Sequence, residues 1–308
     1  MQRYYVPPEA IGPARIVISG DDARHIARVM RLGPGETIEV FDGTGRRVRA
    51  RLERVTPEAV WATPVETLPE AGEPPAPLVL VQALLKGDKM DWIVAKATEL
   101  GITAFYPFVA ARSVVRPAEE RPEAVRRREA RWRKIAKEAA EQSGRSRLPA
   151  LHPLLPADGW VEALKAELSG RLAGVRAYFA DEALTGAPNL LARLLPNRPA
   201  PDLRQPFEAV PSDVANLNAP GSAAPGFLVV VGPEGGWTDA ERAALCALGA
   251  EPIGLGRRIL RAETAAIAAV TLLCLLQEAA SGAGAATSEG PPPDDRKKQA
   301  CHRFRGLL

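Results

Sequence analysis

Hydrophobic and polar residues alternate over the first 68 residues in the manner of short strands in a small sheet. Asp42-Gly43 separates two alternating runs and supplies a hairpin turn. Asp21 or Asp22 is placed to cap one helix that runs through Arg31. The strands are too closely spaced for parallel crossovers, so residues 1–68 predict a small β-barrel with one helix. The runs that fit strands are 15–18, 37–41, 47–52 and 59–62.

The pattern changes after a proline-rich stretch at 69–77, which we interpret as a linker. Residues 78–85 (LVLVQALL) are continuously apolar, as in a strand buried on both faces of a parallel sheet. A helix capped by Asp88 follows, with apolar positions at the 3.6-residue period, and 102–108 fits the next strand. This alternation predicts a second domain over 78–280: an α/β fold with a mainly parallel sheet flanked by helices.

Two stretches carry little periodicity. Residues 196–226 are proline-rich and predict a flexible insertion, and residues 281–308 predict a disordered tail. Between them, the helix expected around 265–276 is apolar on every side, so it must be buried within the chain or against a second subunit. Its uncharged run is shorter than the about 20 residues that span a bilayer. The N-terminus has no apolar leader, so we expect a cytoplasmic protein without a membrane partner.

The amino-acid composition disfavours several classes of protein and of site. Hydrophobic residues make up 46% and charged residues 25%, which indicates a globular protein. Aromatic residues are only 5%, which disfavours rows of base-stacking rings. The three cysteines are far apart and there are three histidines, so we expect neither a disulfide framework nor a metal site.

Charge is concentrated in one segment. The chain as a whole carries +3, but residues 112–147 hold twelve Arg and Lys against six Glu, a local +6. Trp132 and Ile135 give the expected helix an inner face, which leaves the arginines outside. Such a surface is either a solvated face with i,i+4 ion pairs or a site for phosphate groups.

The candidate chemistry lies in two glycine-bearing turns. A buried strand at 227–231 runs into Gly-Pro-Glu-Gly-Gly, and Thr238 with Glu241 forms a capping box that opens a helix. A second turn, 254–264, follows a short strand and leads into the apolar helix. Neither turn is a Walker loop or a dinucleotide fingerprint. The first turn alone is better explained as a sharp strand–helix connection, but two such turns can enclose one flat ligand.

Four motifs, in their order, resemble one family. They are KGDKMDWIVAKATELG, KIAKEAAEQSGR, GPEGGWTDAE and LGRRILRAETAA, and the opening HIARVMRL followed by GETIEVFDGTG is similar too. Together they look like the 16S ribosomal RNA uridine N3-methyltransferases, RsmE type, of the SPOUT class. The resemblance covers roughly residues 1–280 without the insertion and the tail. Trp237 stands where Phe is more usual.

The resemblance implies a PUA-like β-barrel followed by a knotted SPOUT domain. It implies S-adenosyl-methionine as the methyl donor and no metal. It also implies a homodimer through the C-terminal apolar helix, with 16S rRNA of the 30S subunit as the partner. The donor-binding residues carried over are Leu84, Gly232, Pro233, Glu234, Gly235, Gly236, Leu255, Gly256, Ile259 and Leu260.

Methylation at uridine N3 requires loss of the N3 proton, so a nearby cation that stabilises the uracil anion would help. Arg261 is the first candidate and Arg145 the second. Glu263 or Glu141 could accept the proton or orient an arginine, but helix-capping and salt-bridge roles explain both equally well. RNA contacts are expected from Arg3, Arg28, Arg31, Arg112, Arg116 and Arg147.

Two other functions remain open from the sequence. A non-catalytic RNA-binding or ribosome-assembly protein could keep this fold without turnover. A small-molecule enzyme could use the glycine turns for a nucleotide phosphate, although salt-sensitive RNA binding by 112–147 would count against it.

Overall fold

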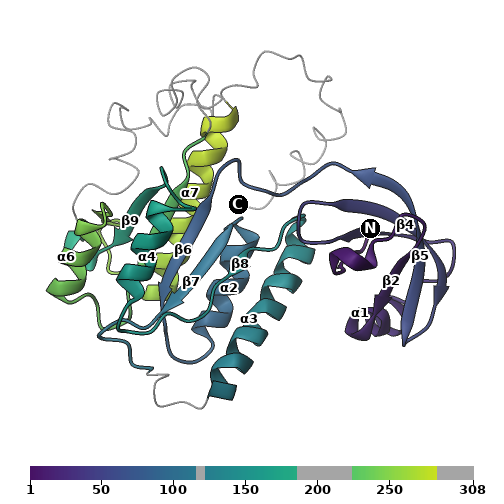
Figure 1. The fold of residues 1–308 in the computed structure, drawn as a ribbon, viewed down its shortest axis with the longest axis horizontal. Coiled ribbons are helices and arrows are strands. Elements are labelled where there is room, and N and C mark those ends of the chain that lie inside the picture. Colours follow the sequence, from purple (N-terminus) through teal and green to yellow (C-terminus); the bar gives the residue numbers. More distant parts are fainter. Residues whose placement is uncertain (116–121, 186–223, 283–308) are drawn as a thin grey trace, which may run out of the picture.

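The computed structural model describes residues 1–115, 122–185 and 224–282, which form two domains joined by the segment between Leu68 and Leu78 (Figure 1). Of the predicted insertion, 196–226, only 224–226 are described. Of the predicted tail, 281–308, only 281–282 are described, and they continue the last helix. The remainder of both segments, and Arg116, lie outside the described residues.

The N-terminal domain is a five-stranded sheet of order β1-β3-β4-β5-β2, in which only the β1–β3 pair is parallel. The expected hairpin at Asp42-Gly43 is confirmed, since β3 and β4 pair antiparallel across it. The capping prediction was wrong: Ser19 is the N-cap, and Asp21 and Asp22 lie in the first turn. The helix is α1 and continues as the π-helical turn η2. The bounds are β1 Arg3–Tyr5, β2 Ile16–Ser19, β3 Thr37–Phe41, β4 Arg47–Val55, β5 Ala59–Leu68, a 3-10 turn Pro8–Ala10, α1 Gly20–Arg24 and η2 His25–Val29.

The C-terminal domain is a six-stranded sheet of order β11-β9-β10-β6-β7-β8, and every pair in it is parallel. Its strands are β6 Leu78–Ala83, β7 Ala104–Phe108, β8 Ala150–Leu151, β9 Arg176–Ala180, β10 Phe227–Val231 and β11 Glu251–Ile253. Its helices are α2 Lys89–Glu99, α3 Pro122–Ser143, α4 Trp160–Ser169, the 3-10 turn η4 Glu182–Leu184, α6 Asp239–Ala247 and α7 Ala262–Gly282.

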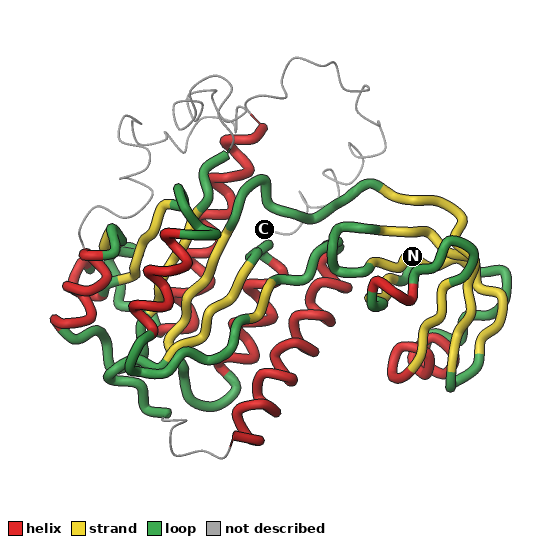
Figure 2. The backbone as a smooth tube through the Cα atoms, viewed as in Figure 1, coloured by secondary structure: helices red, strands yellow, loops and turns green. Residues whose placement is uncertain are grey.

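Helices cover both faces of this sheet, which explains the continuous apolar run of β6 (Figure 2). Leu78 and Leu80 point to the face packed by α2, α3 and α7, with Trp132 of α3 buried there. Val79 and Val81 point to the opposite face, packed by α4 and α6. A strand between two helical layers needs apolar residues at every position, as the sequence predicted.

The apolar helix α7 is longer than expected. Over Ala262–Ser281 it is 20 residues, enough by length and composition to cross a membrane, so the prediction that this segment is too short was wrong. In the structure it packs against α2, β6 and β10 as part of the core. Only 44% of its most apolar window is buried, however, and Leu275 on its outer side is 56% exposed. One face of α7 is therefore an apolar surface.

Candidate functional site

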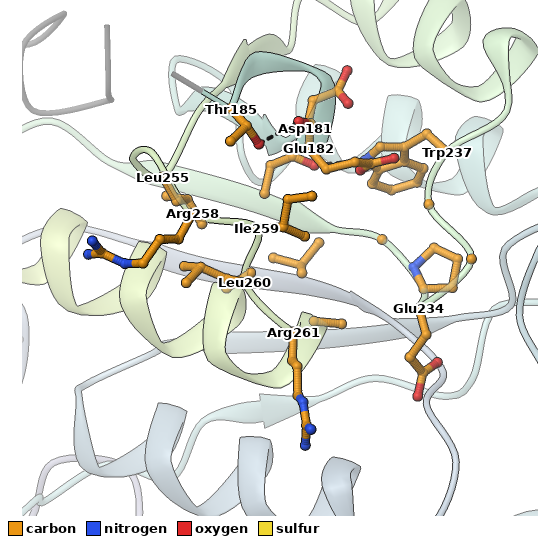
Figure 3. Close-up of a pocket in the computed structure, with 18 of the residues that line it drawn as sticks. Asp181, Glu182, Thr185, Glu234, Trp237, Leu255, Arg258, Ile259, Leu260 and Arg261 are labelled. Atoms are coloured by element: carbon orange, nitrogen blue, oxygen red, sulfur yellow. Dashed lines mark hydrogen bonds between the residues drawn. The ribbon is translucent and has the colours of Figure 1, made fainter. Parts of the chain in front are cut away.

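A cavity of about 570 Å³ opens at the carboxyl ends of three neighbouring strands, β9, β10 and β11. Because these strands are parallel and adjacent, the segments that follow them meet at one edge of the sheet (Figure 3). The volume lies within the range of about 300–1,000 Å³ typical of small-molecule and cofactor sites. Lining residues come from segments 180–185, 231–237 and 253–265, together with Lys86, Lys89 and Val114.

The cavity has an apolar interior and a polar rim. Val231 and Ile253 supply apolar surface at the ends of the buried strands β10 and β11, and the partly buried Leu260 adds to it from the second turn. Glu182 and Glu234 bring carboxylates to opposite sides of the cavity (Figure 3). Such a surface suits a ligand with a flat apolar part and several hydrogen-bonding groups.

The glycine turn after β10 is shaped by Trp237. The indole is 1% exposed, and its Nε1 donates to the Ala180 carbonyl oxygen over 2.7 Å, which ties the turn to the end of β9. A Cβ on Gly232 would come within 2.9 Å of the Trp237 ring, so only glycine fits there. Gly236 has φ +68°, a backbone conformation that favours glycine. These two glycines are therefore required by the fold of the turn itself.

The helix after this turn begins as predicted. Thr238 Oγ1 accepts from the Glu241 amide at 3.2 Å, and the Glu241 carboxylate accepts from the Thr238 amide at 2.9 Å, which completes the capping box. The same carboxylate accepts from the Ala111 amide at 2.9 Å. Glu241 thereby also fixes the loop that carries Arg112.

The second turn, after β11, has a different glycine requirement. Gly256 has φ +116°, and a Cβ there would meet no atom within 4 Å. A Cβ on Gly254 would instead lie 2.6 Å from the Leu184 carbonyl oxygen, so this glycine permits close packing against η4. Both turns and the end of β9 thus line one cavity. The prediction that the two turns enclose one ligand requires this arrangement.

A three-residue ion cluster joins the cavity to α7. Lys89 Nζ lies 2.9 Å from Glu234 and 3.2 Å from Glu263. The hydrogen bond with Glu234 raises the pKa of Lys89. Burial works to raise the pKa of Glu263, but a hydrogen bond from its own amide and the positive charge of Lys89 outweigh it, so this pKa is lowered. Glu263 is therefore a stable anion and a weak proton acceptor.

Nine of the ten predicted donor-binding residues line this cavity. The exception is Leu84, which is 1% exposed, belongs to the core and borders a separate cavity. The nine are Gly232, Pro233, Glu234, Gly235, Gly236, Leu255, Gly256, Ile259 and Leu260.

The four candidate catalytic residues lie in different places. Arg261 lines the cavity, and Glu263 lies beside it within the Lys89 cluster. Arg261 is exposed rather than desolvated, and it makes no ion pair with any other described residue. Its side chain extends away from Leu260, on the same side as Glu234 (Figure 3). Arg261 is thus an exposed cation in the cavity lining, without an ion-pair partner among the described residues.

Arg145 and Glu141 do not reach the cavity, which corrects the expectation that they act there. Arg145 is 1% exposed, donates to the carbonyl oxygens of Thr98 (3.0 Å) and Ile102 (2.8 Å), and pairs with Glu73 of the linker at 2.8 Å. Its guanidinium is committed to fixing the linker against the C-terminal domain.

Glu141 also lies at the contact between the domains. It accepts from the Tyr5 amide at 2.8 Å and lies 3.6 Å from Lys137, which in turn pairs with Asp22 of the N-terminal domain. Burial raises the pKa of Glu141, although it has no access to the cavity. Its contacts hold the two domains together.

The arginines expected to bind RNA are spread over the molecule. Arg112 Nη1 donates to the Gly235 carbonyl oxygen at 3.2 Å, next to the cavity. Arg3 pairs with Glu39 at 2.8 Å and is largely buried, whereas the exposed Arg147 pairs with Glu70. Arg28 and Arg31 are exposed; Arg28 lies in the π-helical turn η2, and Arg31, two residues after its end, has φ +52°.

The sequence analysis missed the third wall of the cavity. Asp181, Glu182 and Thr185 follow β9, and Arg242 of α6 binds Asp181 at 2.9 Å. The available signal was RAYFADEALT, an apolar strand that ends in acidic residues, as β10 ends in glycines. Among the described residues, no group of His, Cys, Asp and Glu could hold a metal ion.

Replacing Gly235 by valine is expected to lower cofactor affinity about 100-fold, equivalent to roughly 2.7 kcal/mol. A Cβ at Gly235 would lie 2.9 Å from the Arg112 Cβ and 3.0 Å from its carbonyl oxygen, so the turn must move into the cavity or away from it. Calorimetry with S-adenosyl-homocysteine measures the effect. Gly249→Ala is the control, because Gly249 has φ +81° but a Cβ there meets no atom within 4 Å. Equal affinities in the two variants would show that the turn does not hold the ligand.

Comparison with known proteins places this geometry in a family. The model of an RNA methyltransferase domain matches residues 72–197 and 201–274, and that of an RNA methyltransferase PUA domain matches 18–65. Ribosomal RNA small subunit methyltransferase E of Bacillus subtilis is 34% identical over 276 residues, covering 89% of this chain and 96% of that protein. The enzyme of the same name from Synechocystis sp. is 34% identical over 87% of this chain and 75% of its own length.

A solved structure agrees with these matches. The crystal structure of ribosomal RNA small subunit methyltransferase E from Neisseria gonorrhoeae, bound to S-adenosyl methionine, has a TM-score of 0.69 and 28% identity, and the match covers 90% of this chain and 98% of that one. The expected fold class, a mainly parallel SPOUT-type sheet after a small PUA-like domain, is confirmed. The chain belongs to the ribosomal RNA small subunit methyltransferase E family of RNA methyltransferases.

Proposed function

We propose that this RNA methyltransferase transfers a methyl group from S-adenosyl-methionine to N3 of a uridine in the 16S rRNA of the small ribosomal subunit, in the cytoplasm. The observation that supports the proposal most is the cavity at the ends of β9, β10 and β11, with the exposed Arg261 in its lining. The related enzyme from Neisseria gonorrhoeae was solved with S-adenosyl methionine bound.

The residues of the cavity fit this cosubstrate. Gly256 leaves open space where a side chain would begin, so its backbone is accessible to a ligand. Leu255, Ile259 and Leu260 would pack against the adenine ring. Ile259 is 77% exposed, and exposing so large an apolar side chain to water is unfavourable unless a ligand covers it. Glu182 would accept hydrogen bonds from hydroxyl or ammonium groups.

S-adenosyl-methionine, when bound, supplies an electrophilic methyl group, so the protein's main task is to position donor and acceptor. The remaining difficulty is that uridine N3 carries a proton, which must be lost for methylation. Arg261 would help with this step. The Arg261 guanidinium would stabilise the negative charge that develops on the uracil as this proton passes to solvent water. Glu263, held as an anion by Lys89, would orient the start of α7 rather than accept the proton.

The direct test is to incubate the protein with unmodified 30S particles and labelled S-adenosyl-methionine, and then to analyse the nucleosides by mass spectrometry. We expect the label in 3-methyluridine from 16S rRNA. Label in another nucleoside would refute the proposed position while leaving the RNA methyltransferase activity intact. Binding to 30S particles without any label transfer would favour a non-catalytic assembly protein instead.

We also propose a homodimer through the outer face of α7. Leu275 is 56% exposed, and Leu272 and Ile267 are only partly covered by the core of this chain. Contiguous apolar surface of this kind is typical of a subunit interface. Leu275→Glu is expected to convert a dimer into a monomer at micromolar concentration, measured by light scattering.

A matched control for the dimer is Val65→Glu, which adds the same charge at a 50% exposed valine of β5 in the N-terminal domain. It should leave the dimer intact. A monomeric parent protein at micromolar concentration would contradict the proposal.

A further inference from the structure

A second cavity, of about 300 Å³, lies beside the first and takes no part in the function proposed above. Its floor is apolar and almost fully buried, formed by Leu84, Leu85, Met90 and Trp132. Its rim is basic, because Arg127, Arg128 and Arg131 reach it from two turns of α3. A buried apolar floor beneath guanidinium groups is suited to a ligand with a flat ring and a phosphate.

The two cavities share a thin wall. In the loop after β6, Lys86 and Lys89 line the first cavity, whereas Gly87 and Asp88 line the second. In the segment before α3, Val114 lines the first and Val115 the second. Ligands in the two cavities would therefore be separated by little more than the backbone of these two segments.

Among the described residues, one of the three rim arginines has no ion-pair partner. Arg131 lies 2.5 Å from Asp91 and 3.9 Å from Asp88, so its charge is paired. Arg127 is exposed and makes no ion pair with any other described residue. A cation in this state, next to an apolar hollow, is available to an anionic ligand.

The ridge between the cavities carries an exposed apolar side chain. Val114 is 63% exposed and lines the first cavity, one residue before Val115, which lines the second. Enzymes that modify a base in RNA or DNA take that base out of its stack and contact the nucleotides on either side. Apolar side chains often occupy the gap between the separated bases.

We infer that the second cavity binds the nucleotide next to the methylated one, with its base on the apolar floor and its phosphate held by Arg127. The inference rests on the proposed function, in which the target uridine enters at the first cavity. Val114 then separates the target base from its neighbour. The substrate would thus be recognised as at least two consecutive nucleotides of a single strand.

The experiment compares Arg127→Gln with Arg126→Gln in the full-length protein. Arg126 is the adjacent residue on α3 and pairs with Glu123 at 3.3 Å, and it does not line the cavity, so both variants lose one charge from one helix. We expect Arg127→Gln to raise the KM for 30S particles about ten-fold above that of Arg126→Gln, with kcat little changed. The affinity for S-adenosyl-homocysteine should be unaltered.

A second readout is binding of the protein to 30S particles at several salt concentrations. Loss of one phosphate contact should reduce the slope of log affinity against log salt by about 1 in Arg127→Gln only. Equal effects of the two substitutions on binding and KM would overturn the inference, since they would show only a diffuse basic surface. Parent protein that binds 30S particles without methylating them would refute the proposed function, whereas the binding comparison would still decide on the cavity.

Discussion

Replacing Arg145 by alanine is expected to lower the free energy of unfolding by about 3–5 kcal/mol, the usual cost of removing one partner from a buried ion pair. The substitution removes the guanidinium that donates to Glu73 Oε2 and to the carbonyl oxygens of Thr98 and Ile102, although Glu73 Oε1 still accepts from the Ser146 and Arg147 amides. Denaturant unfolding monitored by tryptophan fluorescence measures the change. The protein that remains folded should keep its affinity for S-adenosyl-homocysteine, because Arg145 is remote from the cavity lining.

Arg147→Ala is the matched control for this prediction. Arg147 is two residues away and also pairs with a linker carboxylate, that of Glu70, but at the surface. Exposed ion pairs contribute at most about 1 kcal/mol, so its loss should be small. If Arg145→Ala cost no more than Arg147→Ala, the structural role assigned to Arg145 would be wrong.

Replacing Arg261 by alanine is expected to reduce kcat for methylation of 30S particles by about 10²–10³-fold, the usual effect of removing one preorganised group that stabilises a developing anion. Affinity for S-adenosyl-homocysteine should change little, because the guanidinium extends away from the apolar part of the cavity. Single-turnover transfer of label from S-adenosyl-methionine to 30S particles measures the chemical step.

The control for Arg261 is Arg258→Ala, which removes another cation from the lining of the same cavity. Figure 3 shows Arg258 extending in a different direction from Arg261, so its loss should leave kcat nearly unchanged. A similar fall in both variants would indicate a general electrostatic effect on RNA binding. Full activity of Arg261→Ala would remove this residue from the mechanism.

Features that depend on neighbours in sequence could be predicted well. The buried run at 78–85, the capping box of Thr238 and Glu241, and the two glycine turns each leave a local signature. The meeting of the turns at one sheet edge followed from the parallel sheet. The reason why glycine is needed in these turns could not be predicted from the sequence. Gly232 is required by the Trp237 ring, which only the folded turn places beside it.

Features that depend on distant contacts were missed or misassigned. Arg145 and Glu141 occur within a basic, functional-looking segment, yet their partners lie in the linker and the N-terminal domain, 72 and 136 residues away along the chain. β1 is three residues long, and it pairs with β3 rather than a sequence neighbour. Glu182 follows a strand that has no glycine turn to mark it. In each case tertiary packing determines where the residue or strand lies, and no local sequence pattern predicts that position.

The position of β10 has a consequence for how this chain is made. β10 lies between β9 and β6, although it is the fifth of the six strands to be synthesised. A nascent chain that ends before Phe227 therefore holds the group β6-β7-β8, with β6 unpaired on one edge, and β9 alone, with both edges unpaired. The sheet closes only when a late segment inserts at its centre, which is slow because it relies on non-local pairing. Until then the exposed strand edges are open to aggregation, and chaperones that shield such edges during translation should increase the yield of folded protein.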